Sequence, residues 1–425
     1  MLLLAAALTA LLWANLPNDS YVDFWTKHLV INFDSSQLDL TLGEWVNDGL
    51  MAIFFFVVGL EIKRELLRGE LADPRRAALP VAAAIGGMAV PAAIYLVLNA
   101  GSGGRDGWGI PMATDIAFSI GLLALLGTRV PVSLKVFLLA LAIVDDLGAI
   151  AVIAVFYTDD ISFLWLALAG AMFALTAIAG RLGIRALVIY LGVAMVAWLA
   201  MHESGVHTTV AGVVLGLLTP IDPHYHAEEF RVSANEFVRQ VEDAPPENSY
   251  ETSELAKSAL RELEELARES QSPLDRLEQA LHPWTSYAII PIFALANAGV
   301  ELSGGAVQDA ATSRIGWGVV LGLMVGKPLG IALGSYAAVR IGVAALPTGV
   351  SWAQIVTVGM LAGVGFTVSL FITNLAFTDG ALVDEAKIGI LVGSALIGAA
   401  GLVALRFVLP RPSGRQVDAR RPSRL

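Results

Sequence analysis

The chain has 425 residues and a net charge of −11, and 56% of its residues are hydrophobic whereas only 15% are charged. A soluble protein has about 25% charged residues, so this composition, with a mean hydropathy of +0.69, excludes a soluble globular protein and indicates a helical membrane protein. The sequence contains no cysteine, which excludes disulfides, thiolate metal sites and cysteine nucleophiles.

Twelve apolar runs follow one another along the chain. We predict that each crosses a membrane as a helix, because a hydrocarbon core of about 30 Å takes roughly 20 apolar residues. The first run, MLLLAAALTALLWANLP, lacks the basic region of a signal peptide and an A-x-A cleavage site followed by a soluble domain, so we expect it to be a span. The expected limits are 1–16, 46–62, 77–99, 107–127, 131–157, 161–180, 186–201, 204–219, 284–300, 315–339, 352–377 and 386–409.

The positive charges indicate how these spans are oriented. Of the 27 Lys and Arg residues, 22 lie in connections on one side of the predicted membrane and only 4 lie on the other side. Connections rich in Lys and Arg stay in the cytoplasm, so both termini are predicted to be cytoplasmic. The chain then divides into spans 1–8 (1–219), a cytoplasmic loop (220–283), spans 9–12 (284–409) and a basic cytoplasmic tail (410–425).

The first outer connection, HLVINFDSSQLDLTLG (28–43), alternates apolar and polar residues around a DSS turn. This pattern predicts a short β-hairpin. A two-stranded hairpin is marginal by itself, so we expect it to pair with a second subunit.

The loop at 220–283 is the one sizeable polar segment. It has 15 acidic residues against 6 basic ones, and residues 253–270 place apolar side chains on one helical face. We predict an amphipathic cytoplasmic helix, and a solvated regulatory or packing role is favoured over a catalytic one. The acidity argues against anionic lipid or nucleic acid as a partner.

Charged residues occur where they are costly. One at the centre of a bilayer costs about 2.5–3.5 kcal/mol on the insertion scale. Four ionisable residues nevertheless lie near the middle of three spans: Asp115 in the fourth, Asp145 and Asp146 in the fifth, and Lys327 in the tenth. We interpret them as one functional site at a shared depth rather than as unrelated buried charges.

The adjacent pair in LAIVDDLGAI sets the chemistry of that site. Neighbouring helical residues point about 100° apart, so Asp145 and Asp146 face different surroundings. One can pair with a cation on another helix, and Lys327 is the cation available at this depth, while the other lines an aqueous cavity. Carboxylates and the hydroxyl of Thr114 are hard oxygen ligands that suit Na⁺ or Li⁺.

Two spans contain residues that interrupt membrane helices. Pro111 lies four residues before Asp115, and GMLAGVGFTVS in the eleventh span holds Gly359, Gly363 and Gly365. Such residues break a helix where it lines a cavity, although glycines also allow close helix packing. Spans 3–5 and 10–12 run in opposite directions with the interrupted helix in the middle, which predicts an inverted-topology repeat with a midplane site.

Three other functions are consistent with parts of this pattern. An intramembrane aspartyl protease also has two aspartates in the membrane, but on different helices and in YD and GxGD contexts. An ion channel needs repeated rings of residues around a pore, which one asymmetric chain does not supply. A sodium-coupled solute symporter shares the broken-helix plan and is the main alternative.

Blocks along nearly the whole chain resemble the NhaA-type Na⁺/H⁺ antiporters. The blocks are FFFVVGLEIKRELLRG, AAIGGMAVPA, IPMATDIAFSIGLLALLG, LALAIVDDLGAI, SGVHTTVAGVVLG, LHPWTSYAIIPIFALANAGV, GKPLGI and GVGFTVSLFI. This family is itself an example of inverted-repeat transporters with midplane sites, so the repeat and the resemblance are not independent. The 220–283 loop is longer than in the family's best-known members.

The resemblance implies a role for each matching position. Asp146 matches the main cation ligand, Asp145 matches the carboxylate that pairs with Lys327, and Asp115 with Thr114 matches the crossing of the two broken helices. There, opposed helix ends need a negative charge at their N-termini and a positive one at their C-termini. Positions that resemble those linked to pH response are Glu61, Arg64, Glu65, Glu278 and His207.

The resemblance also implies an activity. It predicts a secondary transporter without a cofactor, not an enzyme, that exchanges cytoplasmic Na⁺ or Li⁺ for external H⁺, with two H⁺ per Na⁺. The competition of Na⁺ and H⁺ for the same carboxylates would couple the two fluxes. A multi-pass homodimer in the bacterial inner membrane that regulates cytoplasmic pH and sodium is expected, with residues 28–43 at the dimer contact.

Overall fold

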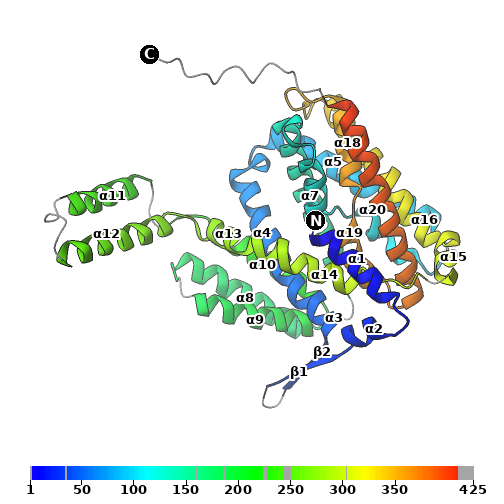
Figure 1. Cartoon of the computed structure of the whole chain (residues 1–425), viewed down its shortest axis with the longest axis horizontal. Coiled ribbons are helices and arrows are strands. Elements are labelled where there is room, and N and C mark those ends of the chain that lie inside the picture. The colour runs from blue at the N-terminus through cyan, green and yellow to red at the C-terminus, as the bar shows by residue number, and fades with distance from the viewer. Residues whose placement is uncertain are drawn as a thin grey trace.

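A computed structural model describes residues 2–33, 36–158, 161–184, 187–223, 227–242, 250–302 and 304–409. Helices dominate this part of the chain, and the one sheet in it is a two-stranded hairpin (Figure 1). The predicted basic tail at 410–425 lies outside the described residues.

The elements of the first half include two strands and four short non-α turns. In order they are α1 Leu2–Ala14, α2 Ser20–Trp25, β1 His28–Phe33, β2 Ser36–Thr41, α3 Leu42–Glu44, η1 Trp45–Leu50, α4 Met51–Arg68, η2 Glu70–Ala72, α5 Pro74–Leu98, η3 Arg105–Met112, α6 Ile116–Ala124, η4 Gly127–Arg129, α7 Val132–Phe156, α8 Phe163–Arg181, α9 Leu187–Glu203 and α10 Thr208–Leu218.

The second half contains helices and no strand among its described residues. Its elements are α11 Ala227–Glu242, α12 Tyr250–Glu269, α13 Pro273–Trp284, η5 Thr285–Ile289, α14 Ile290–Asn297, α15 Gly304–Thr312, α16 Arg314–Leu321, η6 Gly322–Gly326, α17 Lys327–Ile341, α18 Trp352–Ala362, α19 Phe366–Ala376 and α20 Gly380–Val408. The turns η1, η5 and η6 are π-helical, and each is continuous with the α-helix that follows it.

Seven helices are long and apolar enough to cross a membrane, and a bent pair, α18 with α19, makes an eighth candidate. The seven are Leu42–Arg68, Pro74–Leu98, Arg105–Ala124, Val132–Phe156, Phe163–Arg181, Arg314–Ile341 and Gly380–Val408. The predicted spans 1–16, 186–201 and 204–219 correspond to shorter apolar helices, and 284–300 overlaps η5 and α14. An all-α polytopic membrane protein is therefore confirmed, and the number of twelve spans stays a prediction.

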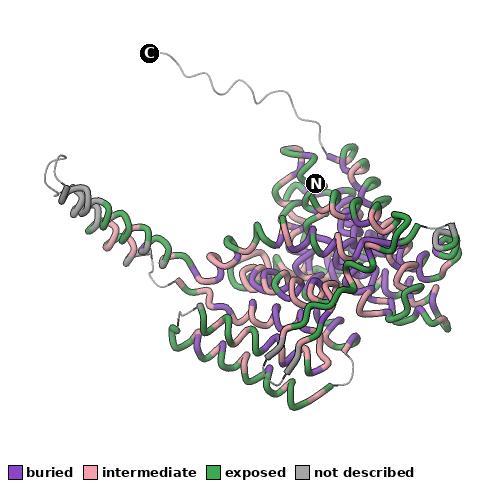
Figure 2. Tube along the Cα trace, turned by 60° about the horizontal axis from the view of Figure 1, so that its bottom comes forward, coloured by how far each residue is buried: buried purple, intermediate pink, exposed green. Residues whose placement is uncertain are grey.

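Small residues allow the closest helix packing in the body. Gly86 of α5 faces Gly330 of α17, where a Cβ on either glycine would lie 2.1 Å from the carbonyl oxygen of the other. Gly59 of α4 meets Gly216 of α10 in the same way, with an added Cβ 2.6 Å from a neighbouring backbone oxygen. Without side chains the backbones approach closely, which gives membrane helices their dispersion contacts. Buried residues gather in this body (Figure 2).

Two features project from the body (Figure 1). The predicted hairpin is confirmed: β1 and β2 pair antiparallel from His28 with Thr41 to Phe33 with Ser36. The helices α11 and α12 pack on each other and extend sideways as an arm. The helix predicted at 253–270 is confirmed as α12, which begins three residues earlier at Tyr250.

Candidate functional site

The fourth predicted span is broken, as its sequence indicated. It begins as the 3₁₀ turn η3, loses helical structure at residues 113–115, and resumes as α6. Pro111 lies inside η3, two residues before the interruption, and packs against Gly322 of η6. The N–H of Asp115 instead donates to the carbonyl of Val364 at 2.7 Å.

The eleventh predicted span is broken at the point that this hydrogen bond reaches. α18 ends at Ala362 and α19 begins at Phe366, and the two helices are bent by 50°. A Cβ on Gly365 would lie 2.2 Å from Ser369 Oγ and 3.1 Å from the carbonyl oxygen of Ala113, so a larger residue would force its neighbours to shift where the breaks cross. Gly363 also lies in the break, whereas Gly359 lies one turn earlier inside α18 and packs against α17.

Asp115 joins the two broken helices at their N-termini. Its Oδ1 accepts the N–H of Phe118 at 2.9 Å, which caps α6. Its Oδ2 accepts the N–H of Thr367 at 3.1 Å and the Thr367 hydroxyl at 2.6 Å, so the same carboxylate caps α19. A carboxylate at a helix N-terminus is stabilised by unpaired N–H groups and by the helix dipole, and here it serves two helices.

Hydroxyl groups satisfy the backbone ends around Asp115. Thr114 donates to the carbonyl of Ala362 at 2.8 Å, and Ser119 donates to that of Leu361 at 2.8 Å, which caps the C-terminus of α18. Ser369 donates to the carbonyl of Ile110 at 2.8 Å, and Ser394 accepts the N–H of Phe366 at 3.3 Å. The sequence argument found Thr114 but missed Thr367, Ser119, Ser369 and Ser394.

Lys327 lies on the other side of the crossing and contacts two groups. The π-helical turn η6 directly precedes Lys327. The backbone N–H of Lys327 donates to the carbonyl of Gly322, five residues back, because Pro328 interrupts the α-helical pattern. Its Nζ lies 2.6 Å from Asp145 Oδ2, and both side chains are at least 98% buried. The same Nζ donates to the carbonyl of Met112, so Lys327 also places a positive charge at the C-terminus of η3.

Asp146 differs from its neighbour because nothing in the described part of the protein pairs with it directly. Its residue is 4% exposed, and no hydrogen bond or ion pair connects its carboxylate to another described residue. The charges that act on it are the carboxylates of Asp145, Glu61 and Asp115, opposed by Lys327. The Oδ1 of Asp145 is also buried without a hydrogen-bond partner among described residues. Two adjacent residues at mid-helix therefore carry carboxylate oxygens that no described residue pairs with.

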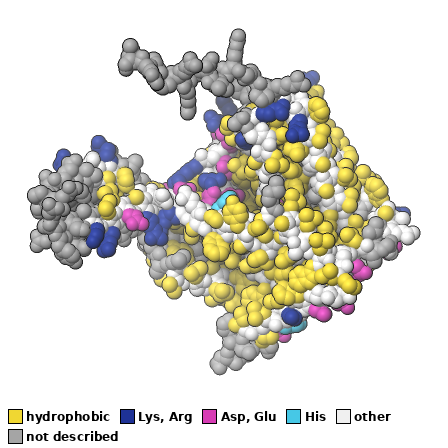
Figure 3. All heavy atoms as spheres, viewed as in Figure 1, with side chains coloured by type: hydrophobic (Ala, Val, Ile, Leu, Met, Phe, Trp, Pro, Cys, Tyr) yellow, Lys and Arg dark blue, Asp and Glu magenta, His cyan; other side chains and the backbone are white. Residues whose placement is uncertain are grey.

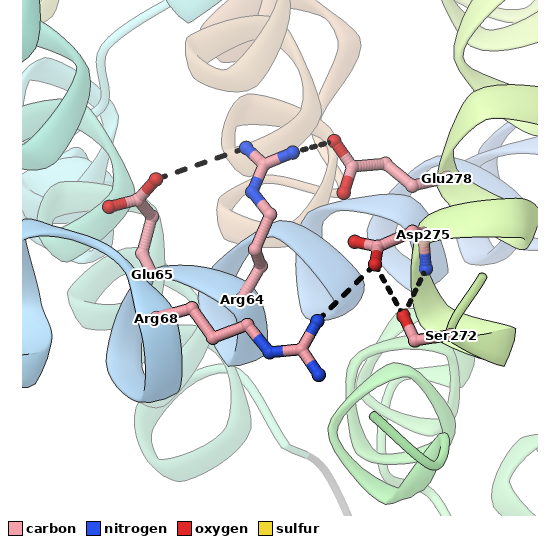
Figure 4. A network of polar contacts seen from close by, with 6 residues as sticks. All are labelled: Arg64, Glu65, Arg68, Ser272, Asp275 and Glu278. Atoms are coloured by element: carbon pink, nitrogen blue, oxygen red, sulfur yellow. Dashed lines mark hydrogen bonds and ion pairs between the residues drawn. The ribbon is translucent and has the colours of Figure 1, made fainter. Parts of the chain in front are cut away.

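A second polar network lies at the Arg68 end of α4 (Figure 4). Arg64 forms an ion pair with Glu278 of α13 and lies 3.9 Å from Glu65. Arg68 lies 3.3 Å from Asp275, which is the N3 residue of α13 and bonds to its cap, Ser272. The structure thus brings together three of the five residues that the resemblance linked to pH response, and sequence reasoning missed Arg68, Ser272 and Asp275.

The other two residues of that set lie elsewhere. Glu61 is on α4 one turn before Glu65, within the electrostatic reach of Arg64 and Glu278. His207 precedes α10, and its ring contacts the carbonyl of Tyr157 at the end of α7. His207 is therefore not part of the Arg64 network.

The Arg68 end of α4 also holds both ends of the arm. Lys63 Nζ donates to the carbonyl of Thr219 at 2.7 Å, and Arg68 donates to that of Ile221 at 2.6 Å. The N–H of Leu274 donates to the carbonyl of Pro220 at 3.2 Å. The segment between 221 and 274 therefore leaves and rejoins the body at neighbouring points. Charged side chains gather near this junction on an otherwise largely hydrophobic face (Figure 3).

Comparison with known proteins gives consistent results. The family model described as Na+/H+ antiporter 1 matches residues 1–405. The chain is 48% identical to the Na(+)/H(+) antiporter NhaA of Rhodopirellula baltica, over 97% of the chain and 92% of that relative. It is 48% identical to the NhaA of Oleidesulfovibrio alaskensis, over 96% and 91%, and 46% identical to NhaA 2 of Sorangium cellulosum, over 99% and 89%.

Proposed function

The chain belongs to the Na⁺/H⁺ antiporter 1 family, and from this premise we propose that it exchanges one cytoplasmic Na⁺, or Li⁺, for two external H⁺ by alternating access around Asp145 and Asp146. The family makes it a secondary transporter and not an enzyme, with Na⁺ and H⁺ as substrates. With its membrane helices, it is a multi-pass protein of the bacterial inner membrane. In this role it would regulate cytoplasmic pH and sodium.

The observation that carries the proposal is the buried carboxylate of Asp146, which has no direct partner among the described residues. An isolated buried charge is so costly that the group either takes up a proton or acquires a counter-charge. H⁺ and Na⁺ are thus alternative occupants of the same oxygens. Because neither can bind while the other does, competition alone couples the two fluxes.

Asp145 would be the second ligand of the cation. Because Asp145 also pairs with Lys327, the bound cation and the Lys327 ammonium would compete for the same carboxylate. The Oδ2 of Asp145 is engaged by Lys327, while its Oδ1 has no hydrogen-bond partner among the described residues. A cation held between the two aspartates would compete with the ammonium for Asp145. The second proton would then be carried by Asp145 or by Lys327. Two protons inward for one Na⁺ outward moves net charge, so the membrane potential would help to drive Na⁺ extrusion.

Asp115 and Thr114 would act as scaffold in this mechanism rather than as ligands. Both oxygens of Asp115 already accept hydrogen bonds, and the Thr114 hydroxyl donates to Ala362. Their contribution would be to hold the crossing of the broken helices together as the site moves between the two sides.

We further propose the twelve-span architecture with cytoplasmic termini and an inverted repeat of spans 3–5 and 10–12. Its support is that the two broken elements, η3 with α6 and α18 with α19, are the middle members of those units and cross at their breaks. In this orientation the Arg64 network faces the cytoplasm, where it would take part in the pH response with Glu61, while His207 would act from the opposite side. The 28–43 hairpin would pair two subunits in a homodimer.

The test is ion exchange in proteoliposomes with an imposed pH gradient and no organic solute. Addition of NaCl or LiCl, but not KCl, should collapse the gradient, and Asp146→Asn should abolish the response. Asp23→Asn, a substitution of the same chemistry on the exposed helix α2, should leave it intact. Full exchange by Asp146→Asn would remove Asp146 from the mechanism. Na⁺ flux that requires an added solute would favour a symporter.

A further inference from the structure

The helices pack as two groups. A site group consists of α5, η3, α6, α7 and α16–α20, and it contains Asp115, Asp145, Asp146 and Lys327. A flanking group consists of α1, α2, η1, α4, α10, α13 and α14. Within it, Tyr21 of α2 holds the end of α14 by donating a hydrogen bond to the carbonyl of Ala296 at 2.7 Å. Apart from the connecting turn η2, the main contacts between the groups are α4 with α7 and α14 with α19.

Three asparagines form a chain of hydrogen bonds across the second of these contacts. The amide of Asn374 in α19 donates to the side-chain oxygen of Asn297 in α14 at 2.5 Å. The amide of Asn297 donates in turn to the side-chain oxygen of Asn47 in η1 at 2.8 Å. Asn297 is 4% exposed, so water cannot readily replace these bonds. The chain thus joins the site group to the flanking group.

Next to the asparagines, aromatic rings of the two groups pack against one another. The ring of Phe371, one turn before Asn374, lies 5.5 Å from that of Phe55 in α4 and 6.3 Å from that of Phe293 in α14. Contacts between apolar rings depend less sharply on exact position than hydrogen bonds do, because dispersion attraction is spread over many weak atom pairs. Hydrogen bonds weaken steeply with misalignment, so the amides fix the position that the rings alone would leave free.

α19 connects this contact directly to the ion site. Thr367, at its first turn, bonds to Asp115 through both its N–H and its hydroxyl. Asn374 follows seven residues later, which is about two helical turns along the same side. A displacement of the crossing that carries α19 as a rigid helix must therefore displace the amide of Asn374 from Asn297.

We propose that the Asn374–Asn297–Asn47 chain is a positioning tie that holds α19, and with it the ion site, against the flanking group in this conformation. This inference rests on the proposed alternating-access exchange. The tie breaks each time the site group moves to face the opposite side and forms again on its return. It is made in one conformation only, so its loss shifts the population toward the other one.

The absence of native cysteine allows a direct test with introduced pairs. Asn297→Cys/Asn374→Cys places the pair across the two groups, and Asn47→Cys/Asn297→Cys places a matched pair within the flanking group. Both variants lose Asn297 and one further asparagine of the chain, so both break the hydrogen bonds and each is compared with itself before and after oxidation. Oxidation in proteoliposomes should slow Na⁺/H⁺ exchange by the cross-group variant at least tenfold, and reductant should restore its rate. Oxidation of the matched variant should leave its own exchange rate unchanged.

Two results of this test would overturn the tie. One is unchanged exchange by a cross-group pair that mass spectrometry shows to be fully oxidised. The other is a cross-group pair that cannot be oxidised, because the side chains would then not be neighbours.

A second measurement does not depend on transport, so it separates failure of the tie from failure of the proposed exchange. Spin labels on Val22→Cys in α2 and Thr378→Cys after α19 report the distance between the groups at exposed positions. Asn374→Ala should raise the ratio of the second distance population to the first about fivefold, the effect of one typical hydrogen bond. Asn99→Ala is the control, because Asn99 bonds only within the site group. Identical distributions for Asn374→Ala and the parent protein would refute the tie.

Discussion

Replacing Lys327 by alanine tests the energetics on which the site depends. The ammonium is 1% exposed and pairs with an equally buried Asp145, so Lys327→Ala leaves a carboxylate in the interior without its counter-charge. Breaking a buried pair by removing one partner costs about 3–5 kcal/mol. Loss of the bond to the carbonyl of Met112 adds about 1 kcal/mol.

This cost should be visible as a lower melting temperature in detergent. At about 2 °C per kcal/mol for a large domain, the expected decrease is roughly 8–12 °C. The double variant Asp145→Asn/Lys327→Ala should recover most of it, because no stranded charge remains. Lys135→Ala, an exposed lysine on α7, should stay within about 0.5 kcal/mol of the parent protein.

The assay is tryptophan fluorescence against temperature, with circular dichroism confirming that each variant is folded at the start. The decrease for Lys327→Ala should be smaller in acid, since protonation neutralises a stranded carboxylate. An unchanged melting temperature would refute the reasoning, and so would a double variant that is less stable than Lys327→Ala.

Three further substitutions probe the scaffold, each by thermal unfolding. Asp115→Ala removes the cap of two helices and should lower stability by about 2–4 kcal/mol, since each N-cap is worth about 1–2 kcal/mol; a loss of under 1 kcal/mol would mean that water replaces the cap. Gly365→Ala places a Cβ against the other broken helix and should cost about 1–3 kcal/mol, whereas Gly170→Ala, with open space around it, should be neutral. Arg64→Ala leaves the buried carboxylate of Glu278 unpaired and should cost about 1–3 kcal/mol; equal stability would show that the ion pair contributes nothing.

The helix breaks could be predicted from sequence because their causes are local. Three glycines in seven residues and a proline four residues before a charge both indicate a helix that cannot continue at mid-membrane. The exact positions, 113–115 and 363–365, could not be predicted. They depend on where the two segments meet, as the close approach of Gly365 to Ala113 shows.

The hydroxyl groups of the site could not be recognised from sequence for a physical reason. A Ser or Thr in an apolar helix commonly bonds to the carbonyl four residues back, as Thr176 does to Met172. Ser119 looks the same in sequence, yet it donates across to α18. Only the fold distinguishes a hydroxyl that satisfies its own helix from one that caps another.

Hydropathy also could not set the lengths of the helices. The apolar run at 204–219 is long enough to suggest a span, but α10 has 11 residues because it begins after His207 and ends before Pro220. The π turn before Lys327 is similarly invisible in hydropathy, because Pro328, which directly follows Lys327, lies in a run that is apolar apart from that lysine.

The attachment of the arm has a consequence for how the protein can vary. Leu274 and Pro220 are joined by a backbone hydrogen bond, and Lys63 and Arg68 hold the start of the excursion to α4. The body therefore already fixes the two ends of the loop, and each doubling of its length adds only about 0.6 kcal/mol of closure entropy. Homologous chains can lengthen, shorten or replace this segment at little thermodynamic cost, and a fluorescent reporter domain could be inserted there while the helices beneath keep their packing.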